Sequence, residues 1–105
     1  MDINITGSGS KGAVVLDGDM NIYHASDLKA PLLGALRNYQ DLEIDLAAVT
    51  HIDTTGVQLL IVLKREAGKL GKTVRLTHHS QVVLQAFDTF QLTAYFGDPV
   101  VIPSG

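Results

Sequence analysis

The stretch Thr50-His51-Ile52-Asp53-Thr54-Thr55-Gly56-Val57 separates two segments with different hydrophobic periods. Before it, apolar and charged residues alternate over 42–46, which predicts a strand with one buried face. After it, an apolar run stops at Gly71, which predicts a helix over about 55–70 with a left-handed glycine cap. The Asp-Thr-Thr-Gly turn therefore lies where a strand passes into a helix, and in α/β sheets ligands and chemistry collect at this edge.

Two adjacent threonines at this junction raise the question of which one caps the helix. Thr55 is followed three residues later by Gln58, the capping-box spacing, so we expect Thr55 to be the N-cap. Thr54 then lies one residue outside the helix with a free hydroxyl, near unpaired N–H groups and the positive end of the helix dipole. That setting favours an added anion such as phosphate. The alternative is that both threonines only cap the helix and shape its turn.

Composition narrows the class of protein. The 105 residues are 46% hydrophobic and 18% charged, which fits one globular domain spanning 1–105. There is no cysteine, hence no disulfide framework and no thiolate metal site. The net charge is −3 with scattered basic residues, which argues against nucleic-acid binding. No apolar run approaches the ~20 residues of a membrane span and no signal peptide opens the chain, so we expect a cytoplasmic protein.

The rest of the chain alternates between strand and helix patterns. Further strands are expected at 2–6, 13–16, 73–77 and 100–102, and further helices after the N-caps Ser26 and Ser80. The first two strands flank a Gly/Ser-rich turn and form a hairpin, Asp17-Gly18-Asp19 is a second turn, and Pro31 should bend the first helix. An opening hairpin followed by such alternation predicts an α/β fold with a single mixed sheet, partly parallel with right-handed crossovers.

The remaining polar residues carry weaker signals. His78 and His79 are expected on the surface or in turns, and neither His24 nor His51 stands at a metal-ligand spacing from them. Asp45 is expected to be a solvated or sheet-end carboxylate and not a general base. No dinucleotide fingerprint and no nucleophile elbow occur. We therefore expect no catalytic residue, no cofactor and no metal, and a protein that is not an enzyme.

Three segments carry a resemblance to a known family. Ile52-Asp53-Thr54-Thr55-Gly56-Val57, with the apolar helix that ends in Gly71-Lys72, resembles the signature Asp-Ser/Thr-Ser/Thr-Gly-Leu segment of STAS domains. These are the bacterial anti-sigma-factor antagonists and their relatives. Leu16-Asp17-Gly18-Asp19-Met20-Asn21 is similar to the family's Gly-Glu-Leu-Asp segment. The run from Arg75 to Val83 is similar to its passage from a strand to the third helix. The resemblance covers nearly the whole chain and implies the STAS fold.

The resemblance implies a phosphorylation switch. In the family, a partner serine/threonine kinase of the GHKL-ATPase type, often itself the anti-sigma factor, phosphorylates the first hydroxyl after the motif Asp. A metal-dependent phosphatase removes the phosphate. Carried over by position, Thr54 is the acceptor, with Thr55 as second choice. The switch and partner surface then comprises Asp19, Asn21, Asp53, Thr54, Thr55, Gly56 and Val57. The family has Asp where this chain has Asn21, which implies weaker phosphorylation or binding without switching.

The sequence leaves open several kinds of system in which such a domain could act. Gln58-Leu59-Leu60 and the segments 64–67 and 96–102 also look like stand-alone STAS proteins that accompany chemotaxis proteins, which implies a chemosensory partner. An alternative within the fold is the STAS subunit of a lipid-transport ATPase complex. An alternative from another class is a small ligand-binding or enzyme domain that uses the pocket at the strand ends.

Overall fold

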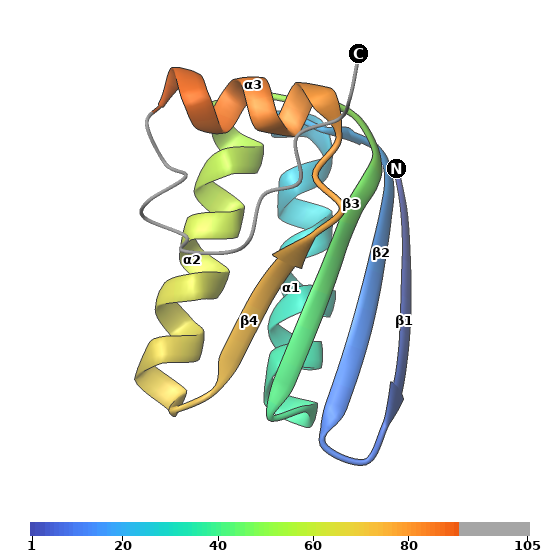
Figure 1. Cartoon of the computed structure of the whole chain (residues 1–105), viewed down its shortest axis with the longest axis vertical. Coiled ribbons are helices and arrows are strands. Elements are labelled where there is room, and N and C mark those ends of the chain that lie inside the picture. Colours follow the sequence, from blue (N-terminus) through green and yellow to red (C-terminus); the bar gives the residue numbers. More distant parts are fainter. Residues whose placement is uncertain (91–105) are drawn as a thin grey trace.

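In a computed structural model, which describes residues 1–90, four strands form one mixed sheet in the order β1-β2-β3-β4 (Figure 1). β1 (Asp2–Ser8) pairs antiparallel with β2 (Lys11–Met20), as the predicted hairpin. β3 (Asp41–Ile52) pairs parallel with β2 and with β4 (Thr73–Thr77). The predicted fold class, a mixed sheet that opens with a hairpin, is therefore confirmed.

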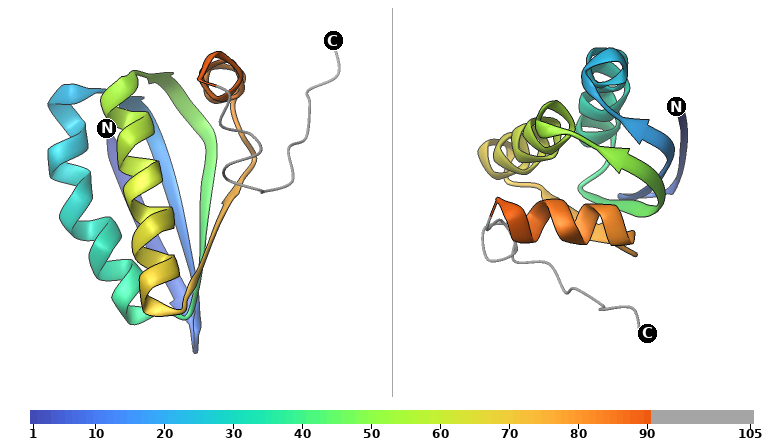
Figure 2. Two further views of the ribbon diagram at one scale, coloured as in Figure 1. Left: turned by 90° about the vertical axis from the view of Figure 1, so that its left-hand side faces the viewer. Right: turned by 90° about the horizontal axis from the view of Figure 1, so that it is seen from above.

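Two helices cover one face of this sheet and a third crosses its end. α1 (Ile22–Asn38) and α2 (Thr54–Leu70) lie side by side on the same face (Figure 2). α3 (Gln81–Thr89) runs crosswise at the carboxyl-terminal end of β3 (Figure 1). α1 and α2 begin at the edge where β2 and β3 end, because each helix directly follows a parallel strand. The starts of all three helices are thereby gathered at one end of the molecule.

The core lies between the sheet and the helices α1 and α2. The strands supply every second residue to it and the helices supply a stripe at helical spacing, as the sequence pattern predicts. The most deeply buried side chains include Val14, Leu16, Leu32, Leu36, Leu42, Ile44, Leu46, Leu60, Leu63 and Leu76. Burying each such side chain contributes roughly 1.5–3 kcal/mol, so this layer is the main source of stability.

The passage from β2 to α1 differs from the prediction. β2 continues to Met20, so Asp17-Gly18-Asp19 is not a turn but an irregular part of the strand. Gly18, with φ of 113°, absorbs this irregularity in a conformation that favours glycine. α1 begins at Ile22 with Asn21 as its N-cap, so the prediction that Ser26 caps this helix is wrong. Pro31 lies well inside α1, which continues through it.

The start of α3 agrees with the prediction. The Ser80 hydroxyl accepts a hydrogen bond from the Val83 backbone N–H at 3.4 Å and caps the helix. Val83 and Phe87 are buried and fix α3 to the rest of the fold. The closing strand expected at 100–102 lies outside the residues that the structure describes.

The two adjacent histidines have different surroundings. His78 is exposed, with φ of 52° and its Nδ1 atom 3.2 Å from Oδ2 of Asp45. His79 is buried and its ring meets the Phe87 ring edge-to-face, with centroids 5.6 Å apart. The expectation of a surface position therefore fails for His79, because the chain turns inward to start α3.

Candidate functional site

Asp53, and not Thr55, caps α2. Oδ1 of Asp53 accepts a hydrogen bond from the Gly56 backbone N–H at 3.0 Å, and the Asp53 backbone is extended. Thr54 is therefore the first residue inside the helix, and the predicted capping box of Thr55 with Gln58 is wrong. A carboxylate suits this place better than a hydroxyl, because it also interacts favourably with the positive end of the helix dipole.

The second oxygen of the Asp53 carboxylate binds the start of α1. Oδ2 of Asp53 accepts from the backbone N–H of Ile22, the first residue of α1, at 2.9 Å. The backbone N–H of Asp53 in turn donates to the Met20 carbonyl oxygen at 3.1 Å. One side chain thus joins the starts of both helices at the end of β2. Sequence reasoning missed the contact to Ile22, because the two residues lie 31 positions apart.

Gly56 and Val57 are interior residues of the same turn. A Cβ atom at Gly56 would overlap the Met20 carbonyl oxygen and would lie 3.0 Å from the Ile52 side chain. Only a glycine therefore lets α2 approach β2 this closely. Val57 is 3% exposed. Both were expected on the partner surface, and the structure instead places them inside, where they hold the helix against the sheet.

The two threonines face different hollows. Thr54 is exposed and lies in a hollow of about 390 Å³ between the start of α2 and α3. Within residues 1–90, no hydrogen bond involves its hydroxyl. Thr55 is half-buried and faces a groove of about 330 Å³ between α1 and α2, which is lined by Ile22, Ala25, Ser26, Lys29, Gln58, Leu59 and Val62. Of the two hydroxyls, that of Thr54 is the more accessible.

Asn21 is committed to α1. Its Oδ1 atom accepts from the backbone N–H groups of Tyr23 at 3.0 Å and His24 at 3.2 Å. An Asp at this position would serve as an N-cap equally well. The replacement of the family's Asp by Asn21 is therefore compatible with the local structure.

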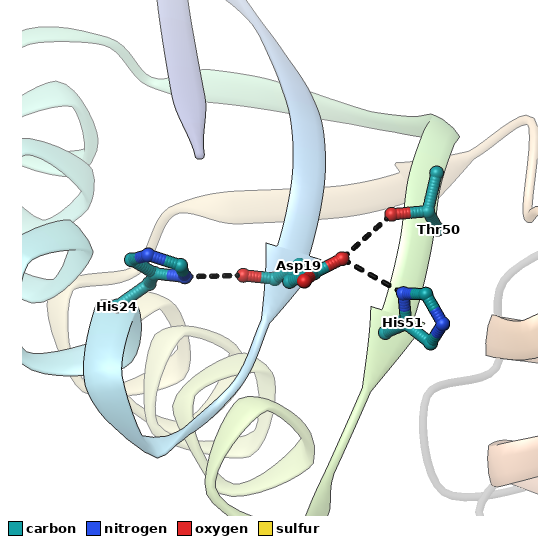
Figure 3. A network of polar contacts seen from close by, with 4 residues as sticks. All are labelled: Asp19, His24, Thr50 and His51. Carbon is teal, nitrogen blue, oxygen red and sulfur yellow. Dashed lines mark hydrogen bonds and ion pairs between the residues drawn. The ribbon is translucent and has the colours of Figure 1, made fainter.

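Asp19 is the centre of a polar network beside this turn (Figure 3). Its Oδ1 atom accepts from the Thr50 hydroxyl and from Nδ1 of His51, each at 2.8 Å. Nδ1 of His24 donates to the Asp19 backbone carbonyl at 3.0 Å. The hydrogen bond from Thr50, followed by that from His51, lowers the pKa of Asp19 below its ordinary value of 3.8. Sequence reasoning placed Asp19 in the site but missed Thr50 and His51, because the parallel pairing of β2 with β3 brings these residues together. It also missed His24, which reaches the Asp19 carbonyl from the first turn of α1.

Among residues 1–90, no three His, Asp or Glu side chains are grouped in a way that could hold a metal ion. No helix in this part of the chain has the length and apolar character needed to cross a membrane.

Comparisons with known proteins agree with this geometry. The family model described as "Mlab, STAS domain" matches residues 3–101, and the chain therefore belongs to the STAS family. No curated protein sequence matches it. The strand order, the three helices and the Asp-Thr-Thr-Gly turn at the start of α2 are thus those of a STAS domain.

Among solved structures, the fold is similar to those of anti-sigma-factor antagonists. Unphosphorylated SpoIIAA superposes with a TM-score of 0.77 at 16% identity over 94% of this chain and 89% of its own. An antagonist from Mycobacterium paratuberculosis gives 0.78 at 17% identity, over 95% and 86% of the two chains. A variant of RsbS from Moorella thermoacetica gives 0.76 at 20% identity, over 99% and 89%. At these identities the likeness establishes the fold.

Proposed function

We propose that this STAS domain is a cytoplasmic bacterial protein-binding switch of the anti-sigma-factor-antagonist kind, regulated by reversible phosphorylation of Thr54. The observation that carries the proposal is the division of roles within its turn. Asp53 caps α2, Gly56 and Val57 pack inward, and Thr54 alone presents an uncommitted, exposed hydroxyl. SpoIIAA, whose fold is similar, has been solved in both unphosphorylated and phosphorylated forms, which supports a modification in this kind of domain.

The surface around Thr54 explains how a phosphate would act. The first turn of α1 exposes Ile22 and Tyr23, at 62% and 80%, and Asp53 ties that turn to the start of α2. These apolar side chains offer a partner a contact area close to Thr54. A phosphate adds roughly −1.5 to −2 charge at pH 7, and it opposes docking wherever the partner presents carboxylates or apolar surface. Binding is therefore switched by surface charge.

The partners follow from the same proposal. The kinase is of the GHKL-ATPase type and is either an anti-sigma factor or a chemosensory signalling protein, and a metal-dependent phosphatase reverses the modification. The fold comparisons with anti-sigma-factor antagonists support a binding role over an enzymatic one. They do not favour the lipid-transport subunit or the small ligand-binding domain. Copurification with the ATPase subunit of a transport complex would instead favour the role of a lipid-transport subunit.

The direct test is mass spectrometry after incubation with the cognate kinase and ATP. The expected result is one phosphate on Thr54, none on the Thr54→Ala variant, and normal modification of Thr55→Ala as the matched control. A phosphate on Thr55 or Ser80 would overturn the assignment.

A binding assay completes the test. Thr54→Glu should bind the kinase-like partner more weakly than the wild type, and Thr54→Ala at least as well. The loss for Thr54→Glu should be partial, because a carboxylate carries about half the charge of a phosphate. Equal binding by both variants would show that Thr54 does not control docking.

A further inference from the structure

His51 stands beside the proposed phosphorylation site in a fixed orientation. Its ring is 77% exposed, yet Nδ1 lies 2.8 Å from Oδ1 of Asp19, which is itself held by the Thr50 hydroxyl. An exposed histidine ordinarily samples several rotamers, and a hydrogen bond to a carboxylate selects one of them. In Figure 3 the other ring nitrogen, Nε2, lies on the side of the ring away from Asp19.

The contact with Asp19 also settles which nitrogen carries the proton. A carboxylate oxygen can only accept, so Nδ1 of His51 is the donor. The lowered pKa of Asp19 keeps this carboxylate ionised through the physiological range. In the neutral ring, Nε2 is therefore a free acceptor, and in the protonated ring it is a second donor. His51 can meet either a monoanionic phosphate, by accepting its P–O–H, or a dianionic one, by donating to it.

His51 and Thr54 line the same hollow between α2 and α3. His51, Thr54 and Asp53 line it from the β3–α2 side, and α3 supplies Val82, Gln85, Ala86, Thr89 and Phe90. Apart from Asp53, whose two oxygens are taken by Gly56 and Ile22, none of these other residues carries a charge. His51 is thus the one titratable donor among the described residues that line the hollow around Thr54.

We propose that His51, held by Asp19, is the ligand of the phosphoryl group on Thr54, with its Nε2 atom bonded to a phosphate oxygen. The proposal rests on the phosphorylation of Thr54 put forward above. In this proposal Asp19 is a positioning residue, because it orients the His51 ring. The Asp19–His51 pair then directs the phosphate toward α3. His24, whose Nδ1 atom bonds to the Asp19 backbone, supports the same pair from α1.

The test is a ³¹P NMR titration of the 105-residue chain with phosphothreonine at position 54, made by the kinase or by semisynthesis. The second ionisation of an exposed phosphothreonine lies at about pH 6. A neighbouring imidazolium should lower this midpoint by roughly half a pH unit in the wild type, a small shift because the site is open to solvent and salt. His51→Phe and His51→Gln should both raise the midpoint relative to the wild type, by the same amount.

Two further variants separate positioning from charge. His78→Asn removes the other exposed histidine that pairs with a carboxylate, Asp45, and should leave the ³¹P midpoint unchanged. Asp19→Asn keeps His51 but should weaken the shift, and the ¹⁵N signals of the His51 ring should show a mixture of tautomers in the unmodified variant. A purely structural Asp19 would leave those ring signals as in the wild type.

The outcomes distinguish the two proposals. A midpoint that does not respond to either His51 variant refutes the assignment of His51, even in a chain that the kinase modifies at Thr54. A kinase that leaves Thr54 unmodified refutes the proposed function, whatever the titration of the semisynthetic chain shows.

Discussion

Asp53→Ala is the most informative single change, because it removes two hydrogen bonds at once, one to the start of α2 and one to the start of α1. Oδ1 caps α2 through Gly56, and the loss of an N-cap costs about 1 kcal/mol. Oδ2 accepts from Ile22 at the start of α1, and a hydrogen bond to a charged group contributes roughly 1.5–3 kcal/mol. The bond itself lies at an exposed position and Ile22 is 62% exposed, so water can replace part of this bond, and the lower end applies. We expect a total loss of about 2–3 kcal/mol.

Urea denaturation followed by far-UV circular dichroism measures this loss as a change in midpoint at constant slope. Asp53→Ser serves as the dissecting variant, because a serine hydroxyl can cap α2 but is too short to hold Ile22 as well. It should lose about half as much stability as Asp53→Ala. Thr55→Ala is the matched control and should change stability by no more than about 0.5 kcal/mol. A larger loss for Thr55→Ala than for Asp53→Ala would refute the assignment of the cap.

Three further predictions concern the turn, the core and the network beside them. Gly56→Ala should destabilise by about 1–3 kcal/mol in thermal melts, because the new methyl group meets the backbone carbonyl of Met20, and an unchanged melting temperature would contradict the close approach. Leu60→Ala should cost about 2–5 kcal/mol in urea melts through cavity formation, and a cost below half a kilocalorie would place the residue outside the core. The pKa of Asp19 is lower in the folded chain than its ordinary value of 3.8, so its stabilising effect is complete above that value and disappears as pH falls through the folded pKa. The difference in stability between wild type and Asp19→Asn should accordingly shrink on acidification from about pH 7 to about pH 3, and a difference that grew would contradict the sign.

The fold could be predicted from the sequence because its signals are local. Alternation over 42–46, the run that ends at Gly71 and the Ser80 cap each depend on residues within a few positions of one another. The boundary between β2 and α1 could not be predicted in this way, because two cap signals compete there. Ser26 is a good N-cap residue, yet Asn21 is used, since Asp53 accepts the N–H group of Ile22 and fixes the start of the helix five residues earlier.

The Asp-Thr-Thr-Gly turn was correctly predicted to lie between a strand and a helix, but its cap was misassigned for the same reason. The spacing of Thr55 and Gln58 is a genuine capping-box pattern, but it describes only one helix. Asp53 serves two helices at once, and that advantage depends on a contact across 31 positions of sequence. The network of Asp19 with Thr50 and His51 likewise arises from the parallel pairing of two strands, which no local spacing reveals.

The division of roles within the turn also bears on how the proposed switch would work. The contacts that hold the start of α2 come from Asp53, Gly56 and Val57, and within the described chain none comes from the Thr54 hydroxyl. A phosphate on Thr54 therefore adds charge without removing a contact that supports the fold. Any change in partner binding must then arise at the surface, through the charge itself and its place beside His51, rather than through refolding of the domain. A modified chain that is no less stable in urea than the unmodified chain, together with unequal affinities for the partner, is the expected signature of such a switch.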